Sequence, residues 1–197
     1  MNTRQGSSRS SRSGEGEVES EKALVQRARR RDLAAFEELV NRHRAQVFAL
    51  ALHSLQDLED AEDALQGTFL EAWERFPSFR GEVPVSAWLA GLCGREIASR
   101  LPAHADGPKP TILRLVAPPP RAAAHDPRSL RLRVAIASTV ARMPAPRRVS
   151  FVLGELGGAS CAEIASALGL DPPAVRRHIH EALLSVLGSI EACGRAG

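Results

Sequence analysis

Tyrosine is absent from this chain, aromatic residues make up only 4% of it, and three cysteines occur in 197 residues. With so few rings, Leu, Val and Ala must fill any core, which favours helices. Cys93, Cys161 and Cys193 are odd in number and form no Cys-x-x-Cys pair, so neither a disulfide framework nor a zinc site is indicated. No apolar run approaches the roughly 18 residues of a membrane-spanning helix. We therefore expect a protein of the reducing cytoplasm, neither secreted nor inserted in a membrane.

The formal net charge of +3 is divided unevenly along the chain. Residues 1–101 carry 14 Lys or Arg and 16 Asp or Glu, a net charge of −2. Residues 102–197 carry 12 and 7, a net charge of +5. A basic segment suits DNA, because each phosphate that it neutralises releases counterions. We therefore expect the C-terminal half of the chain to bind DNA.

Four stretches differ in composition. Residues 1–17 are mostly Ser, Gly, Glu and Arg and predict a disordered tail, because few apolar side chains are present to offset the entropy of ordering. Residues 18–101 and 129–192 carry apolar residues at helical spacing. Residues 102–128 hold seven of the thirteen prolines and predict an extended, semi-stiff linker. The predicted fold is all-α, with two small helical domains joined by a proline-rich linker.

The C-terminal domain has the pattern of a helix-turn-helix. Ser160 and Glu163 have the spacing of a capping box, Gly169 suits the end of that helix, and Asp171 with Pro172 suits the start of the next. An ordinary helix pair with a solvated basic edge is the alternative reading of this pattern. We expect the second helix to bury one stripe of residues, namely Val175, Ile179, Ala182, Leu183 and Val186. The candidate DNA-contacting residues are Pro173, Arg176, Arg177 and His180.

The N-terminal domain contains a strongly acidic segment. Between Asp57 and Glu74 there are seven carboxylates and no Lys or Arg. Such a surface repels phosphate and suits a basic protein partner, although a solvated helix face has the same pattern. Trp73 and Trp88 are expected in the core, where tryptophans at helical spacing usually lie. The loop at residues 79–88 is then the expected strand-contacting segment.

Two blocks of the sequence resemble extracytoplasmic-function sigma factors of bacterial RNA polymerase. The block that resembles their second conserved region consists of Leu33–Val40, Asp57–Trp73, Phe79–Glu82 and Trp88–Leu89. The block that resembles their fourth region runs from Met143 to Leu156 and on to Val175–His180. The resemblance implies a promoter-specificity subunit whose first domain binds core RNA polymerase and the minus-ten element, and whose helix-turn-helix reads the minus-thirty-five element. An anti-sigma factor is a further candidate partner.

The resemblance also implies site residues. Those expected to bind polymerase belong to the family pattern Asp-Ala-Glu-Asp-x-x-Gln-x-x-Phe and are Asp60, Asp63, Gln66 and Phe69. Those expected near the minus-ten element, with a solvated surface as the alternative, are Arg80, Arg95 and Arg100. We expect no catalytic residue, metal or cofactor, because no Ser/His/Asp set, phosphate-cradling glycine loop or metal cluster is present. An enzyme is therefore the least favoured class.

Several positions depart from the family pattern. Gly67 replaces a usual acidic residue, and Gly91 and Gly94 lie where aromatic and basic residues are usual. In the second helix, His178, Glu181 and Leu183 replace frequent arginines. These departures fit a divergent sigma factor, or a sigma-like regulator that binds polymerase or an anti-sigma partner without initiating. A stand-alone helix-turn-helix regulator is a third hypothesis, which leaves the acidic motif unexplained.

Overall fold

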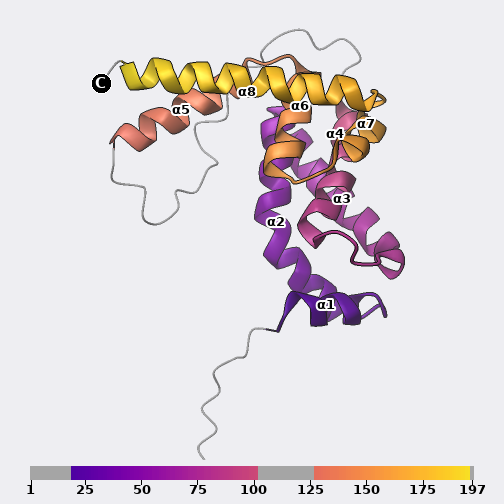
Figure 1. The fold of residues 1–197 in the computed structure, drawn as a ribbon. Helices are drawn as coiled ribbons and strands as arrows, with labels where there is room; N and C mark the ends of the chain where they lie inside the picture. The colour runs from indigo at the N-terminus through magenta and orange to yellow at the C-terminus, as the bar shows by residue number, and fades with distance from the viewer. Residues whose placement is uncertain (1–18, 102–126, 196–197) are drawn as a thin grey trace, which may run out of the picture.

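A computed structural model of the protein describes residues 19–101 and 127–195. The predicted tail and nearly all of the predicted linker lie outside these residues. Within them every regular element is helical, which confirms the all-α prediction. None of the helices in these two ranges combines the length and apolarity that crossing a bilayer requires. In chain order the helices are α1 (Glu21–Ala28), α2 (Leu33–Leu55), α3 (Leu58–Arg75), α4 (Val85–Arg100), α5 (Pro127–Ala141), α6 (Ala145–Phe151), α7 (Cys161–Leu168) and α8 (Pro172–Arg195) (Figure 1).

The first domain consists of α1 to α4, with α2 as its long central helix (Figure 1). The side chains of Ser20, Asp32 and Asp57 each accept a backbone N–H from the first turn of α1, α2 and α3, which satisfies donors that a helix start leaves open. Gln56 ends α2 in the left-handed conformation, with φ of 60°. Because only two residues separate α2 from α3, α3 turns back against α2 and the two helices pack together.

The second domain consists of α5 to α8. Pro144 occupies the N-cap position of α6, and a π-helical turn, η2 (Val152–Leu156), follows that helix. The predicted helix-turn-helix features are confirmed: the capping box of Ser160 and Glu163 forms, Gly169 has φ of 64°, and Asp171 caps α8 through the N–H of Ala174. The long α8 lies across the domain, with α5 packed beside it (Figure 1).

The prediction that Leu183 is buried is wrong, since 36% of it is exposed. The other members of the stripe do face the protein: Val175, Ala182 and Val186 are buried and Ile179 is partly buried. Leu183 follows Ala182 directly, and one residue along a helix turns the side chain by about 100°. It therefore points away from the core.

The two domains pack against each other, which the sequence had not predicted. Helix α6 and the η2 turn contact α2, and α7 contacts α4 (Figure 1). One hydrophobic core includes Leu50 and Leu92 of the first domain together with Val149 and Ile164 of the second. The described helices therefore form one packed body.

Candidate functional sites

The acidic helix α3 presents its carboxylates to solvent because its small and apolar residues face inward. Ala61, Ala64 and Thr68 are fully buried. The exposed positions one residue away include Glu62 and Asp63. Asp57 accepts hydrogen bonds from the backbone N–H groups of Glu59 and Asp60, at 3.1 and 3.2 Å. Carboxylates in the first turn also interact favourably with the helix dipole.

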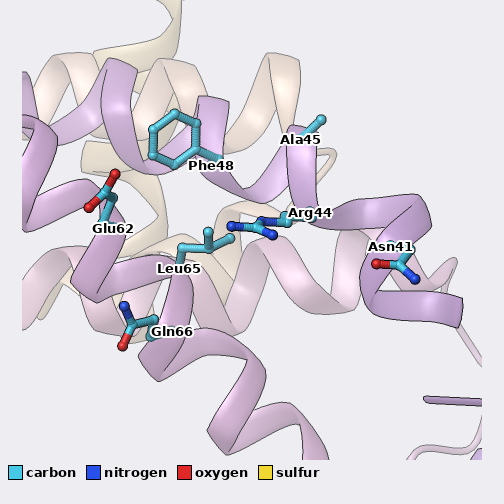
Figure 2. A pocket seen from close by; sticks show the side chains of 7 residues that line it. All are labelled: Asn41, Arg44, Ala45, Phe48, Glu62, Leu65 and Gln66. Atoms are coloured by element: carbon cyan, nitrogen blue, oxygen red, sulfur yellow. The ribbon is translucent and has the colours of Figure 1, made fainter. Parts of the chain in front are cut away.

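A groove of about 600 Å³ runs between α2 and α3. Figure 2 shows Arg44 and Phe48 reaching from α2 toward Leu65 of α3, with Glu62 and Gln66 on the α3 side. The apolar floor and polar rim suit a protein side chain from a partner surface. Two further α2 residues, Asn41 and Ala45, complete the lining.

The structure divides the four predicted polymerase-binding residues. Gln66 lines the groove, and Asp63 is exposed beside it. Asp60 is half-buried in the first turn of α3, and Phe69 is partly buried against the core. Sequence reasoning missed the α2 half of the groove. Its signal was present, because Asn41, Arg44, Ala45 and Phe48 are spaced at three, four and seven residues and hence share one helix flank.

The three arginines predicted near the minus-ten element have different surroundings. Arg80 lies in the loop before α4 with its side chain 82% exposed and 3.9 Å from Glu82. Arg95 donates to the Glu71 carboxylate at 3.0 Å, and Arg75 donates to the same oxygen at 2.9 Å. Arg80 is therefore the most accessible of the three to a phosphate.

Arg100 is held by Glu96, whose carboxylate lies against Gly67. The guanidinium of Arg100 donates to the Glu96 carboxylate and to its backbone carbonyl. A Cβ at Gly67 would lie 2.6 Å from the Glu96 Oε2 atom. The space that a side chain would need is thus filled by a carboxylate from α4. The acidic group is present near this position but comes from another helix.

An aromatic cluster joins η1 (Phe76–Ser78) to α4. Phe76 lies 5.4 Å from Trp88 and 5.5 Å from Phe36 between ring centroids, and Phe36 lies 5.0 Å from Trp73. Both tryptophans are half-buried and pack against the core, so each keeps an accessible edge. The exposed part of the predicted strand-contacting loop is residues 80–84.

In the helix-turn-helix, the four candidate DNA-contacting residues are exposed on the first turns of α8: Pro173, Arg176, Arg177 and His180. Glu181, one of the departures from the family pattern, forms an ion pair with Arg147 of α6. It therefore ties α8 to the domain. Burial, followed by the charge of Arg177, lowers the pKa of half-buried His178, so its imidazole favours the neutral form.

The possible metal ligands and the buried cysteine of the described residues give no sign of a metal centre or a reactive thiol. Across residues 19–101 and 127–195, no group of three or more His, Cys, Asp or Glu side chains could hold a metal ion. Burial raises the pKa of the Cys93 thiol to about 12, so the thiolate form of this residue is disfavoured.

Two family models match the chain at the two domains. Sigma-70 region 2 matches residues 39–105 and Sigma-70, region 4 matches residues 133–186. Together these regions define a sigma factor of bacterial RNA polymerase.

Similar proteins of known identity show to which group of sigma factors the chain belongs. ECF RNA polymerase sigma factor SigM of Mycobacterium tuberculosis is 31% identical over 142 residues, which cover 71% of this chain and 68% of that protein. RNA polymerase sigma-H factor of Pseudomonas aeruginosa is 24% identical over 178 residues, covering 83% and 90%. The chain belongs to the ECF sigma factors, as its resemblance had indicated, and it is a subunit that directs core polymerase to promoters. The region 2 match excludes a stand-alone helix-turn-helix regulator.

Two solved structures share the fold. CnrH, in complex with the cytosolic domain of CnrY, aligns with a TM-score of 0.53 and 24% identity, covering 88% of this chain and 99% of that one. The sigma factor RpoE from Bartonella quintana, in complex with the anti-sigma factor NepR, aligns with a TM-score of 0.50 and 17% identity, covering 79% and 96%.

Sigma factors, the class to which this chain belongs, are in general non-enzymatic initiation factors.

Proposed function

We propose that this sigma factor docks on core RNA polymerase through the groove between α2 and α3. The observation that supports this is the pairing of an apolar floor, Phe48 and Leu65, with the exposed carboxylates of Glu62 and Asp63 at the same part of α3. Apolar contacts give affinity at such a surface, and complementary charge steers the encounter. Asp63 and Gln66 are the central contacts, Asn41 and Arg44 extend them, and Asp60 and Phe69 support α3 from within.

Promoter DNA is the second proposed partner. Arg80 contacts a backbone phosphate beside the minus-ten element. Arg95 and Arg100 make further phosphate contacts when they release the carboxylates of Glu71 and Glu96. The exposed edge of Trp88 offers a stacking surface for an unpaired base. At the minus-thirty-five element, Arg176, Arg177 and His180 lie at the helix start that a helix-turn-helix points into the major groove. Pro173 lies in the first turn of α8 and contacts the DNA beside these residues.

The remaining assignments follow from the same role. The protein performs no covalent chemistry itself, needs no cofactor, and works in the cytoplasm with the polymerase. Because CnrH and RpoE are each described in complex with a second protein, and NepR is an anti-sigma factor, an anti-sigma factor is a proposed regulator of this chain.

Run-off transcription with purified core polymerase, over a library of upstream sequences from the source genome, tests this function. We expect specific transcripts that Asp63→Lys reduces at least tenfold, because it places a cation against a surface that favours carboxylates. Glu74→Lys is the matched control: it makes the same charge change at an exposed residue near the end of α3, away from the groove.

Polymerase affinity measured alongside transcription separates the alternatives. Binding without a transcript from any promoter would favour a sigma-like regulator that does not initiate. Absence of binding would contradict the proposed docking groove.

A further inference from the structure

We propose that the two domains of this chain hold each other closed, and that the closed form covers the face of α4 on which the minus-ten contacts lie. The inference rests on the proposed function of that face. It concerns contacts of the chain with itself and requires no anti-sigma factor.

Each domain caps a helix end of the other. The side-chain amide of Gln56, which follows α2, donates to the carbonyl of Ala141 at the end of α5, at 2.9 Å. In return, Arg148 of α6 donates from Nε to the carbonyl of Ser54 in the last turn of α2, at 3.0 Å. The last carbonyls of a helix have no partner within it, and a cation there also favours the helix dipole.

These contacts are buried, so they bear on the stability of the closed form. Gln56 is 4% exposed and Arg148 is 7% exposed. A second bond from Arg148 reaches the carbonyl of Met143 at 2.8 Å, and burial lowers the pKa of this guanidinium. A buried charge is costly unless its donors are satisfied. Arg148 fits its site because a carbonyl of the other domain accepts one of its hydrogen bonds.

Glycines permit the close approach. A Cβ at Gly94 of α4 would lie 2.9 Å from Leu153 Cδ1 and 3.4 Å from the Cβ of Ala167. From the other side, a Cβ at Gly157 would lie 2.8 Å from the Cβ of Ala90. Gly94, which departs from the family pattern, thus lets the second domain seat against α4.

The closed form covers a functional face. A groove of about 390 Å³ is lined by Arg75, Trp88 and Arg95 of the first domain and by Ala162, Glu163 and Ser166 of α7. Glu163 Oε1 lies 3.7 Å from the position of a Cβ on Gly91, so a carboxylate stands beside the face that would receive DNA. Arg75 and Arg95 on this face already share the Glu71 carboxylate, so Glu163 adds a second negative charge beside them, and α7 must move away before DNA can use the whole face.

Opening is therefore part of DNA binding. When only a fraction of molecules is competent, the apparent dissociation constant is raised by the inverse of that fraction. A variant that favours the open form should bind DNA more tightly without any new contact to DNA.

Gly94→Gln is the test variant. The new side chain clashes with Leu153 in the closed form, and α4 itself tolerates it because glutamine is a better helix former than glycine. Gly188→Gln in α8 is the matched control, since a Cβ there meets nothing within 4 Å. Gln56→Asn is an independent variant: asparagine accepts the left-handed conformation, but its shorter side chain does not reach Ala141.

Two measurements on the full chain are needed. Small-angle X-ray scattering reports the radius of gyration, and fluorescence anisotropy with a labelled single-stranded DNA pool of random sequence reports affinity without polymerase. We expect a compact wild type, with Gly94→Gln more extended and binding DNA about tenfold more tightly. Gln56→Asn should change both readouts in the same direction, and Gly188→Gln should change neither.

Three outcomes would overturn the inference: a wild type as extended as Gly94→Gln, an extended variant whose DNA affinity is unchanged, or two variants both as compact as the wild type. Run-off transcription reports independently on the proposed function. A chain that opens and binds DNA more tightly but supports no transcript would leave the closed form established and the initiation role refuted.

Discussion

At the scale of single residues, the departures from the family pattern at Gly67, Gly94 and Glu181 have structural partners. Gly67 leaves room for the Glu96 carboxylate, Gly94 seats Leu153, and Glu181 pairs with Arg147. The sequence marked these positions as unusual, but the residues that contact them lie 29 to 59 positions away in the chain. Such couplings depend on tertiary packing, which local patterns do not encode.

A double-mutant cycle measures the coupling at Gly67. Replacing a helical glycine with alanine is worth about 1 kcal/mol. In the wild type, Gly67→Ala must also displace the Glu96 carboxylate and disturb its pair with Arg100. We expect about 1 kcal/mol of added unfolding free energy from Gly67→Ala in a Glu96→Ala background, and a smaller gain in the wild type. Urea denaturation measures both. Equal gains would show that Glu96 moves aside freely.

His53 links stability to pH. Burial lowers its pKa from the ordinary value of 6.5, so the unfolded chain binds a proton more readily than the folded one. Stability then rises with pH, and this contribution is lost as pH falls through 6.5 toward the lower folded value. We expect the unfolding free energy to fall between about pH 7.5 and pH 5, and His53→Gln to flatten that fall. An unchanged slope in the variant would assign the effect elsewhere, with His178 as the next candidate.

At the scale of elements, the sequence predicted best where a local signal suffices. Caps at Ser160 and Asp171 and a glycine stop at Gly169 locate α7 and α8 closely, because each acts within four residues. The π-helical η2 turn was not predicted, because it lies among tertiary contacts with α2, α4 and α7 that no local pattern encodes. The α2 flank of the groove between α2 and α3 was missed because spacing shows that Asn41, Arg44, Ala45 and Phe48 share one helix flank but not which helix packs beside it.

The capping box of α7 gives an element-scale prediction. Ser160→Ala removes the acceptor of the Glu163 N–H, at 3.2 Å, and should cost about 1 kcal/mol of unfolding free energy. Hydrogen exchange of the first-turn amides of α7 should accelerate. Ser166→Ala, at an exposed position later in the same helix, should be neutral or slightly stabilising. Equal effects of the two changes would contradict the role of the cap.

At the scale of the whole molecule, the shared hydrophobic core leads us to expect that the two domains unfold as one cooperative unit. The sequence predicted the two domains from their separate apolar patterns, and region 2 and region 4 match where these patterns lie. It did not predict their contact, since Gln56 and Arg148 are 92 positions apart and each resembles a surface residue. Their burial becomes evident only when the helix ends are brought together.

Arg148→Met tests whether the contact between the two domains stabilises the whole chain. The variant leaves the carbonyls of Ser54 and Met143 without their donor and should lower the unfolding free energy by about 2 kcal/mol. Both tryptophans lie in the first domain, so their fluorescence reports that domain alone, whereas circular dichroism reports all helices. We expect coincident transitions in the wild type. Arg142→Met, at an exposed residue nearby, is the control. Separate transitions in the wild type would show that the domains unfold independently.

Arg148 also affects how the molecule responds to ionic strength. While the domains are packed, this guanidinium is screened from ions in solution by the protein around it. Separation would bring it into contact with solvent and add one cation to the basic half of the chain. The open form should therefore respond more steeply to salt when it binds DNA than the charge visible on the closed surface suggests.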